Sequence, residues 1–214
     1  MKMENNNKNI KSIKWLIFLT FTIIILIITK KVLDQDIMKI DLIGYNFISK
    51  YLINPKLTSI IKMITNIGSA FSLITITIVL LIVIKDKLVS YSILGNLIII
   101  TFFNQMLKLT LQRPRPTDFR LINETGYSFP SGHSMVNTAF YGYLIYIIYK
   151  RIKNKYLKWS LIILLSILII TIGISRIYLG VHYTSDVVAG FLISICYLII
   201  YTGLINKLID RSSK

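Results

Sequence analysis

Six long blocks of apolar residues divide the chain, and short polar or charged segments separate them. The blocks lie approximately at Ile13–Val32, Ser69–Ile84, Leu88–Leu107, Ser134–Tyr149, Leu157–Ile174 and Val187–Ile205. Each is near the roughly 20 residues that a helix needs to cross a membrane. Their many Ile and Thr residues would favour strands in water, but a backbone in lipid must form its hydrogen bonds internally. The pattern therefore predicts an all-α integral membrane bundle of six transmembrane helices.

The segment between the first two blocks has a different pattern. Residues 34–67 are only moderately apolar, and Asp, Gly, Asn, Pro and Lys residues interrupt them. This pattern predicts two short interfacial helices, which either cover a site or form a plain connecting hairpin. The first block could be a signal peptide, but its apolar run is long and no A-x-A-like cleavage site follows, so we expect a retained span. No repeat or linker divides the chain, and residues 1–214 are expected to form a single membrane-embedded domain.

Composition supports the membrane class. Of the 214 residues, 54% are hydrophobic and only 16% are charged, whereas soluble domains have about a quarter charged residues. The formal net charge of +16 would suggest nucleic acid as a partner of a soluble protein. Here many cations flank apolar blocks, so the anionic membrane surface is the expected partner and nucleic acid is not. The lone Cys196 is expected to be a packing residue.

The distribution of lysine and arginine predicts the orientation in the membrane. Segments 1–14, 85–87, 150–158 and 207–214 lie on one side of the predicted bundle and carry 14 of the 25 basic residues. Because basic residues collect in cytoplasmic loops, both termini are expected to be cytoplasmic. The polar motifs described next then lie at the extracytoplasmic face.

The first motif joins the end of the third block to a loop. Lys108 is followed seven residues later by Arg115, and Pro114 and Pro116 break the helix around Arg115. The spacing places two cations at one membrane face, although an isolated Lys108 would more simply extend its amine to the interface. Arg113 also precedes a proline, and we expect it to be a loop or headgroup contact.

The second motif is Pro130-Ser131-Gly132-His133, directly before the fourth block. Pro and Ser suit a helix start, whose free N–H groups attract anions. Gly132 lets a ligand approach the backbone closely, and Ser131 and His133 can donate to it. The alternative is an ordinary helix cap with an exposed histidine.

The third motif spans the junction of the last two blocks. Ser175-Arg176 closes the fifth block, and His182 and Asp186 open the sixth. An i,i+4 pair shares one helix face, so Asp186 can accept a hydrogen bond from one ring nitrogen of His182 and leave the other free to attack. A purely structural His–Asp pair is the alternative.

The three motifs occur together, in order and at one predicted membrane face, and with them the chain resembles the type 2 phosphatidic acid phosphatase family of membrane phosphatases. The resemblance covers about Asn66–Ile205, and all specified motif positions are present. It implies that His182 is a nucleophile forming a phosphohistidine, that Asp186 orients it, and that His133 is the general acid and then the base. The implied phosphate-binding groups are Lys108, Arg115, Ser131, Gly132 and Arg176.

The resemblance also implies a substrate class. We expect hydrolysis of a lipid phosphate at a bacterial cytoplasmic membrane, with undecaprenyl diphosphate as substrate. Phosphatidylglycerophosphate, or broad specificity that includes phosphatidic acid, is the alternative, and loop 117–127 is expected to set headgroup choice. Vanadium-dependent haloperoxidases share the motifs but are soluble, and a non-catalytic lipid-binding protein would not need both histidines. Two His and one Asp could bind zinc, but zinc sites rarely have three cations beside them, so we expect no metal and no cofactor.

Overall fold

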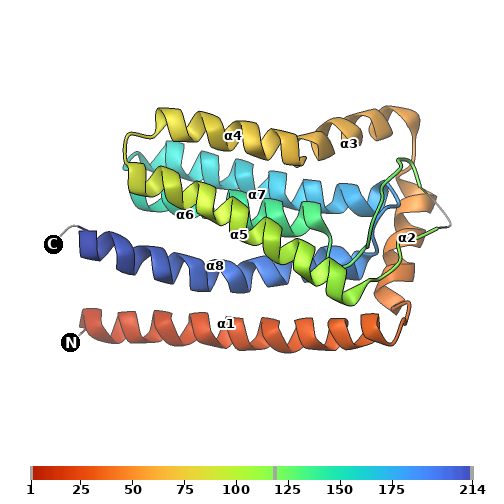
Figure 1. Ribbon diagram of the computed structural model, residues 1–214, viewed down its shortest axis with the longest axis horizontal. Helices are drawn as coiled ribbons and strands as arrows, with labels where there is room; N and C mark the ends of the chain where they lie inside the picture. Colours follow the sequence, from red (N-terminus) through yellow and green to blue (C-terminus); the bar gives the residue numbers. More distant parts are fainter. Residues whose placement is uncertain (1, 118–119, 213–214) are drawn as a thin grey trace.

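The computed structural model describes residues 2–117 and 120–212, and it is all-helical across them. Its eight helices are α1 (Lys2–Leu33), α2 (Lys39–Tyr51), α3 (Pro55–Ile67), α4 (Ala70–Val83), α5 (Lys87–Leu111), α6 (Gly132–Arg151), α7 (Lys155–Tyr178) and α8 (Thr184–Ser212). The long helices run roughly parallel or antiparallel to one another, and α2 lies across one end of the bundle (Figure 1). Both termini lie at the other end.

Each predicted apolar block coincides with a helix, but the count of six spans is not confirmed. Among the described residues, α1, α5, α7 and α8 are long and apolar enough to cross a membrane. A fifth span results if α3 and α4, which meet at a bend of 46°, count together. The short α4 has 14 residues. Its N-cap Ser69 accepts a hydrogen bond from the Ser72 N–H, so α4 starts as a new helix and does not run straight on from α3.

The composition of α6 explains why fewer helices than apolar blocks qualify as spans. It has 20 residues but a mixed composition, and it packs against α5, α7 and α8. Its Ser134, Asn137 and Thr138 are buried, and Asn137 donates to the carbonyl of Gly68, between α3 and α4, at 2.9 Å. A helix that other helices surround does not have to be apolar all round.

The two short predicted helices exist, but they differ in their surroundings. Asn54 caps α3 by accepting from the Leu57 N–H at 2.8 Å, and Pro55 occupies the first turn, where its missing N–H has no cost. α3 packs on α7 and meets α4 at the 46° bend. α2 packs on both α7 and α8 and thereby covers the end of the bundle where the polar motifs lie.

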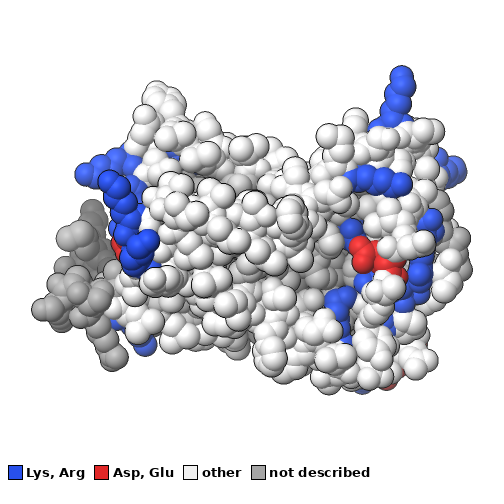
Figure 2. Space-filling view, turned by 45° about the horizontal axis from the view of Figure 1, so that its top comes forward, with Lys and Arg blue, Asp and Glu red and all other residues white. Residues whose placement is uncertain are grey.

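The surface has the polarity of a multi-pass membrane protein. On the face in Figure 2, Lys and Arg gather near the two ends, and a broad uncharged band lies between them. Large exposed apolar side chains, such as Phe71, Ile82 and Phe102, are distributed along the helices. Lipid is the environment that tolerates this much exposed apolar surface.

The close approach of α6 and α8 depends on a glycine. A Cβ atom at Gly190 would lie 2.9 Å from Ser134 Cβ and 3.1 Å from the Met135 amide nitrogen and the Ser131 carbonyl oxygen. Two of these three atoms are backbone, so the helices would have to separate. Gly203, in the same helix, has nothing within 4 Å of such a Cβ.

We therefore expect Gly190→Ala to destabilise the protein by about 1–3 kcal/mol, the usual cost of overpacking. The matched control Gly203→Ala should be neutral or should stabilise, because Ala favours a helix over Gly by about 1 kcal/mol. The measurement is the temperature at which Cys196, the single cysteine, becomes reactive to a thiol dye in detergent. Equal melting temperatures for the two variants would contradict the close packing.

Candidate functional site

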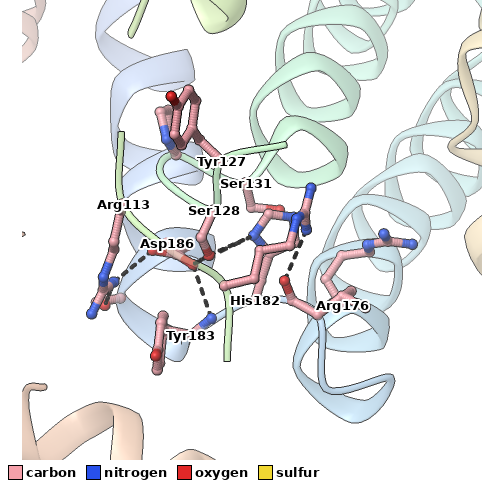
Figure 3. A network of polar contacts seen from close by, with 12 residues as sticks. Arg113, Tyr127, Ser128, Ser131, Arg176, His182, Tyr183 and Asp186 are labelled. Carbon is pink, nitrogen blue, oxygen red and sulfur yellow. Dashed lines mark hydrogen bonds and ion pairs between the residues drawn. The ribbon is translucent and has the colours of Figure 1, made fainter. Parts of the chain in front are cut away.

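The three motifs meet at the end of the bundle that α2 covers. Lys108 lies in the last turn of α5, and Arg176 lies in the last turn of α7. Ser131 caps α6, and Asp186 lies in the first turn of α8. Figure 3 shows the side chains of Arg113, Ser128 and His182 gathered around Asp186.

The sequence had suggested that His182 lies on the same helix as Asp186. In the structure, His182 lies in the turn before α8. The chain leaves α7 through Gly180, whose φ of 69° is left-handed and favours glycine. The Tyr183 N–H donates to Asp186 Oδ2 at 2.9 Å, which closes the turn. As a result, His182 Nδ1 lies 3.4 Å from the same carboxylate oxygen.

The Asp186 carboxylate has donors on both oxygens. Oδ2 accepts from Ser128 Oγ as well as from the Tyr183 N–H, and Oδ1 accepts from Arg113 Nη1 at 2.6 Å. Its place in the first turn of α8 adds the attraction of the helix N-terminus for negative charge. The carboxylate, with 0% exposure, is thereby fixed in one orientation beside the His182 ring.

The other ring nitrogen of His182 faces a cation. His182 Nε2 lies 3.1 Å from Arg115 Nη1. Burial lowers the pKa of the His182 imidazole to about 4, and the charges of Arg115 and Lys108 also lower it, against the opposing effect of Asp186. The ring is therefore neutral near pH 7. With the proton on Nδ1, toward Asp186, Nε2 carries the lone pair.

Arg115 and Lys108 are bonded to one short segment of the following loop. Arg115 donates to the carbonyls of Gly126 and Thr125, each at 3.0 Å, and Lys108 Nζ donates to the Tyr127 carbonyl at 2.5 Å. Burial lowers the pKa of the Arg115 guanidinium, although Glu124 nearby raises it. The two cations of the first motif therefore bind neighbouring carbonyls of one loop segment.

Arg176 is the most deeply buried cation of the site, with 1% exposure. Nη1 donates to Thr65 Oγ1 at 2.9 Å, Nη2 forms an ion pair with Glu124, and Nε has no hydrogen-bond partner among the described residues. Burial would raise the pKa of Glu124, but the charge and hydrogen bond of Arg176 outweigh it and lower that pKa. Loop 120–127 is thus attached to α7.

Two residues of the second motif, Ser131 and His133, lie in different environments. Ser131 Oγ accepts from the Ser134 N–H at 3.4 Å and from Ser134 Oγ at 3.0 Å, so the hydroxyl caps α6. His133 lies on the other side of the motif, where it lines a cavity of about 220 Å³ between α4, α5 and α6. A separate cavity of about 170 Å³ lies beside His182, between α2 and the loop at Pro116.

Two residues that contact Asp186, Arg113 and Ser128, were not predicted from the sequence as site residues. Arg113 is buried and bonded to Asp186 and Asp41, so its expected role as a loop or headgroup contact is wrong. The repeated Arg-Pro pair was a signal for it, but the spacing from Lys108 favoured Arg115. Ser128 had no signal in the sequence, because a single serine in a loop is unremarkable.

In the part of the chain that the structure describes, no group of three or more His, Cys, Asp or Glu side chains is arranged to hold a metal ion.

Asp118, in the loop expected to set headgroup choice, lies outside the described residues. Arg120, in the same loop, donates to the Pro116 carbonyl at 2.6 Å and is exposed.

Comparison with known proteins identifies the class that this fold and site define. The model of the PAP2 superfamily matches residues 90–210. Phosphatidylglycerophosphatase B of Bacillus subtilis is 36% identical over 107 residues, which cover 49% of this chain and 52% of that protein. Undecaprenyl-diphosphatase of Sulfolobus acidocaldarius is 25% identical over 191 residues, 84% of each chain.

A solved structure extends the similarity to most of the chain. The crystal structure of a transmembrane PAP2-type phosphatidylglycerolphosphate phosphatase from Bacillus subtilis superimposes with a TM-score of 0.77 and 25% identity, covering 89% of this chain and 96% of that one. The chain belongs to the PAP2 superfamily. Its aligned segment spans only about half the length of the Bacillus phosphatidylglycerophosphatase B sequence.

The neutral state of His182 predicts a specific dependence of stability on pH. The folded protein keeps the ring unprotonated down to a pKa of about 4, whereas an exposed His takes up a proton near pH 6.5. Between these pH values the unfolded state binds more protons, so acid favours unfolding. This contribution to stability is complete above about pH 6.5 and is lost as the pH falls toward 4.

As the pH is lowered from about 6.5 to 4.5, we expect the melting temperature of His182→Gln to decrease less than that of the wild type, because Gln does not titrate. Tryptophan fluorescence during heating measures this in detergent. Parallel decreases in the two proteins would contradict a neutral, buried His182.

Proposed function

We propose that this protein is a lipid phosphatase that removes the terminal phosphate of a lipid phosphate or diphosphate, with undecaprenyl diphosphate converted to undecaprenyl phosphate. One observation carries the proposal. His182 is held by Asp186 through Nδ1, while Nε2 faces the guanidinium of Arg115. A nucleophilic nitrogen that is oriented from behind and directed at a cation suits attack on a phosphoryl group.

The reaction proceeds in two balanced steps. His182 Nε2 forms a bond to phosphorus, and the bond from phosphorus to the lipid oxygen breaks. His133 donates a proton to the departing oxygen. His133 then takes a proton from water, whose oxygen displaces His182 from phosphorus and releases inorganic phosphate. Asp186 stabilises the positive charge that the ring carries while the phosphohistidine exists.

The cations provide the charge that the phosphoryl oxygens require. Lys108, Arg115 and Arg176 converge on the site, and the Ser131 hydroxyl and the Gly132 backbone lie at the start of α6, where N–H groups attract anions. The present partners of Lys108 and Arg115 are mostly neutral carbonyl oxygens. A charged phosphoryl oxygen forms stronger hydrogen bonds with the same donors, so it competes effectively for them.

The cavity at His133 supports sideways entry of a lipid. Its lining is mostly apolar and comes from Leu73 and Ile74 of α4, Leu97 of α5 and Val136 of α6. Since His133 protonates the leaving oxygen, the lipid part of the substrate must lie on the His133 side of the phosphorus. An isoprenoid or acyl chain in this cavity meets that requirement and buries its apolar surface.

A second substrate has a specific observation in its favour. One of the relatives described above is a phosphatidylglycerophosphatase B, so phosphatidylglycerophosphate is the alternative substrate, and one enzyme acting on both lipids is consistent with the site. A non-catalytic lipid-binding protein is the alternative class. It would retain lipid affinity after His182→Ala, whereas a phosphatase would lose turnover.

The proposed location is a bacterial cytoplasmic membrane, with cytoplasmic termini and the site at the opposite face. The termini lie at the end of the bundle away from α2 (Figure 1). The basic segment 150–158 lies at the α6–α7 junction, and basic residues favour the cytoplasmic side. A cysteine introduced at Arg120 should react with an impermeant reagent in intact cells; protection there, with reaction at Lys153, would invert this orientation.

The first test is phosphate release by the purified protein in detergent with EDTA present. We expect release from undecaprenyl diphosphate or phosphatidylglycerophosphate, because no step requires a metal. His182→Ala should abolish it, and His133→Ala should slow it by roughly 10²-fold or more, the usual effect of losing acid–base catalysis. Phosphatidic acid is assayed in parallel as a third lipid. Loss of activity in EDTA that zinc restores would contradict the metal-independent mechanism.

A further inference from the structure

A buried aspartate on α2 lies within reach of the catalytic groups. Asp41 is 2% exposed. Its Oδ2 accepts from Arg113 Nη2 at 2.9 Å and from the Met38 N–H at 3.3 Å, and its Oδ1 accepts from the Ser185 N–H at 2.8 Å. A buried carboxylate requires such partners because its desolvation is costly. Asp41 thereby connects α2 to the first turn of α8.

Arg113 extends this connection to Asp186. While Nη2 holds Asp41, Nη1 donates to Asp186 Oδ1 at 2.6 Å and to Ser185 Oγ at 2.8 Å. The guanidinium lies 4.1 Å from the centre of the Tyr183 ring, which fixes its plane. Figure 3 shows Arg113 reaching Asp186 from the side opposite His182. One planar fork thus joins two carboxylates that are distant in the sequence.

We propose that Asp41 and Arg113 are positioning residues for the reaction, and that the chain Asp41–Arg113–Asp186 fixes the Asp186 carboxylate and keeps one net negative charge beside His182. This inference rests on the proposed function. Neither residue belongs to the three motifs, so α2 becomes part of the active site and not only a cover over it.

The orientation part of the proposal follows from the two oxygens of Asp186. Oδ2 serves His182, Ser128 and the Tyr183 N–H. Oδ1 has Arg113 as its side-chain donor. If Arg113 is lost, the carboxylate can rotate about its side-chain bonds and draw Oδ2 away from His182. Misplacement of this kind slows a reaction even when every catalytic residue is still present.

The charges of Asp41, Arg113 and Asp186 together affect the state that His182 adopts during the reaction. When His182 bonds to phosphorus, its ring becomes positive, and a net negative charge beside it stabilises that state. Arg113 alone beside Asp186 would cancel the carboxylate charge. Asp41 offsets Arg113, so that two carboxylates and one guanidinium leave one negative charge. Asp41 therefore affects the chemical step more than the binding of phosphate.

The test separates the chemical step from ground-state binding. Asp41→Asn keeps the shape and can still accept from the Ser185 N–H, but it removes the charge. We expect kcat to fall roughly 10- to 100-fold, the effect of one hydrogen bond to a charged group. Competitive inhibition by inorganic phosphate should stay within about twofold, because Lys108, Arg115 and Arg176 are untouched. Arg113→Lys should show the same split.

Two further variants complete the design. Asp36→Asn is the matched control, since Asp36 is half-exposed beside α2 and pairs only with Lys31 among the ion pairs of the described residues; it should retain wild-type kcat. Arg113→Gln alone leaves two buried carboxylates with no cation between them, and their repulsion favours protonation of Asp186. The double variant Asp41→Asn with Arg113→Gln removes that repulsion and leaves Asp186 as the one negative charge, so its kcat should exceed that of Arg113→Gln alone. If Arg113→Gln does not fold, Asp41→Asn and Arg113→Lys decide the question.

Three outcomes would overturn the inference. The first is wild-type kcat in Asp41→Asn. The second is an equal loss of kcat and of phosphate affinity in Asp41→Asn and Arg113→Lys, which would indicate a packing role alone. The third is a double variant slower than Arg113→Gln. Wild-type protein that releases no phosphate from any lipid would instead contradict the proposed function itself, so the two failures are distinguishable.

Discussion

A carboxylate with no access to water, at the end of a membrane bundle, is the constraint on which the site depends. Asp186 cannot stay charged there without hydrogen-bond donors, and these come from three separate parts of the chain: Arg113 after α5, Ser128 before α6 and the Tyr183 N–H before α8. Satisfying one buried charge therefore draws the loops together. The same contacts direct His182 toward Arg115.

The bundle supplies the fixed frame for this arrangement. α6 is buried among α5, α7 and α8, and its approach to α8 is close enough that Gly190 leaves no room for a Cβ. The backbone N–H of Ser131 donates to the Asp186 carbonyl at 3.1 Å, which joins the starts of these two helices. Packing in the membrane thus determines how far the two proposed catalytic histidines lie from each other, since each is adjacent to one of these helix starts.

Much of this could be predicted from the sequence, because lipid imposes simple rules. Apolar blocks near 20 residues located the helices, and the motifs predicted that Asp186 and Arg115 lie near His182, which both of them contact. The number of spans was less predictable. α6 is shielded by other helices and is therefore partly polar, and α4 is short because the chain bends between it and α3.

The contacts of Asp41, Arg113 and Ser128 could not be predicted, for a physical reason. Asp41 and Arg113 are 72 positions apart, and only the placement of α2 across the bundle end brings them together. No local spacing rule describes a contact of that kind. Arg113 was misassigned because a charged residue after a span usually faces headgroups, whereas here two buried carboxylates hold it.

The central claim is that His182 attacks phosphorus and becomes covalently phosphorylated. The most direct measurement is rapid acid-free quenching of the enzyme with a phosphorus-32-labelled lipid substrate, followed by mapping of the label on peptides. The account predicts alkali-stable, acid-labile label on the peptide that contains His182, and its absence in His182→Ala. Turnover at full rate with no label on the protein, or label on the His133 peptide, would contradict it.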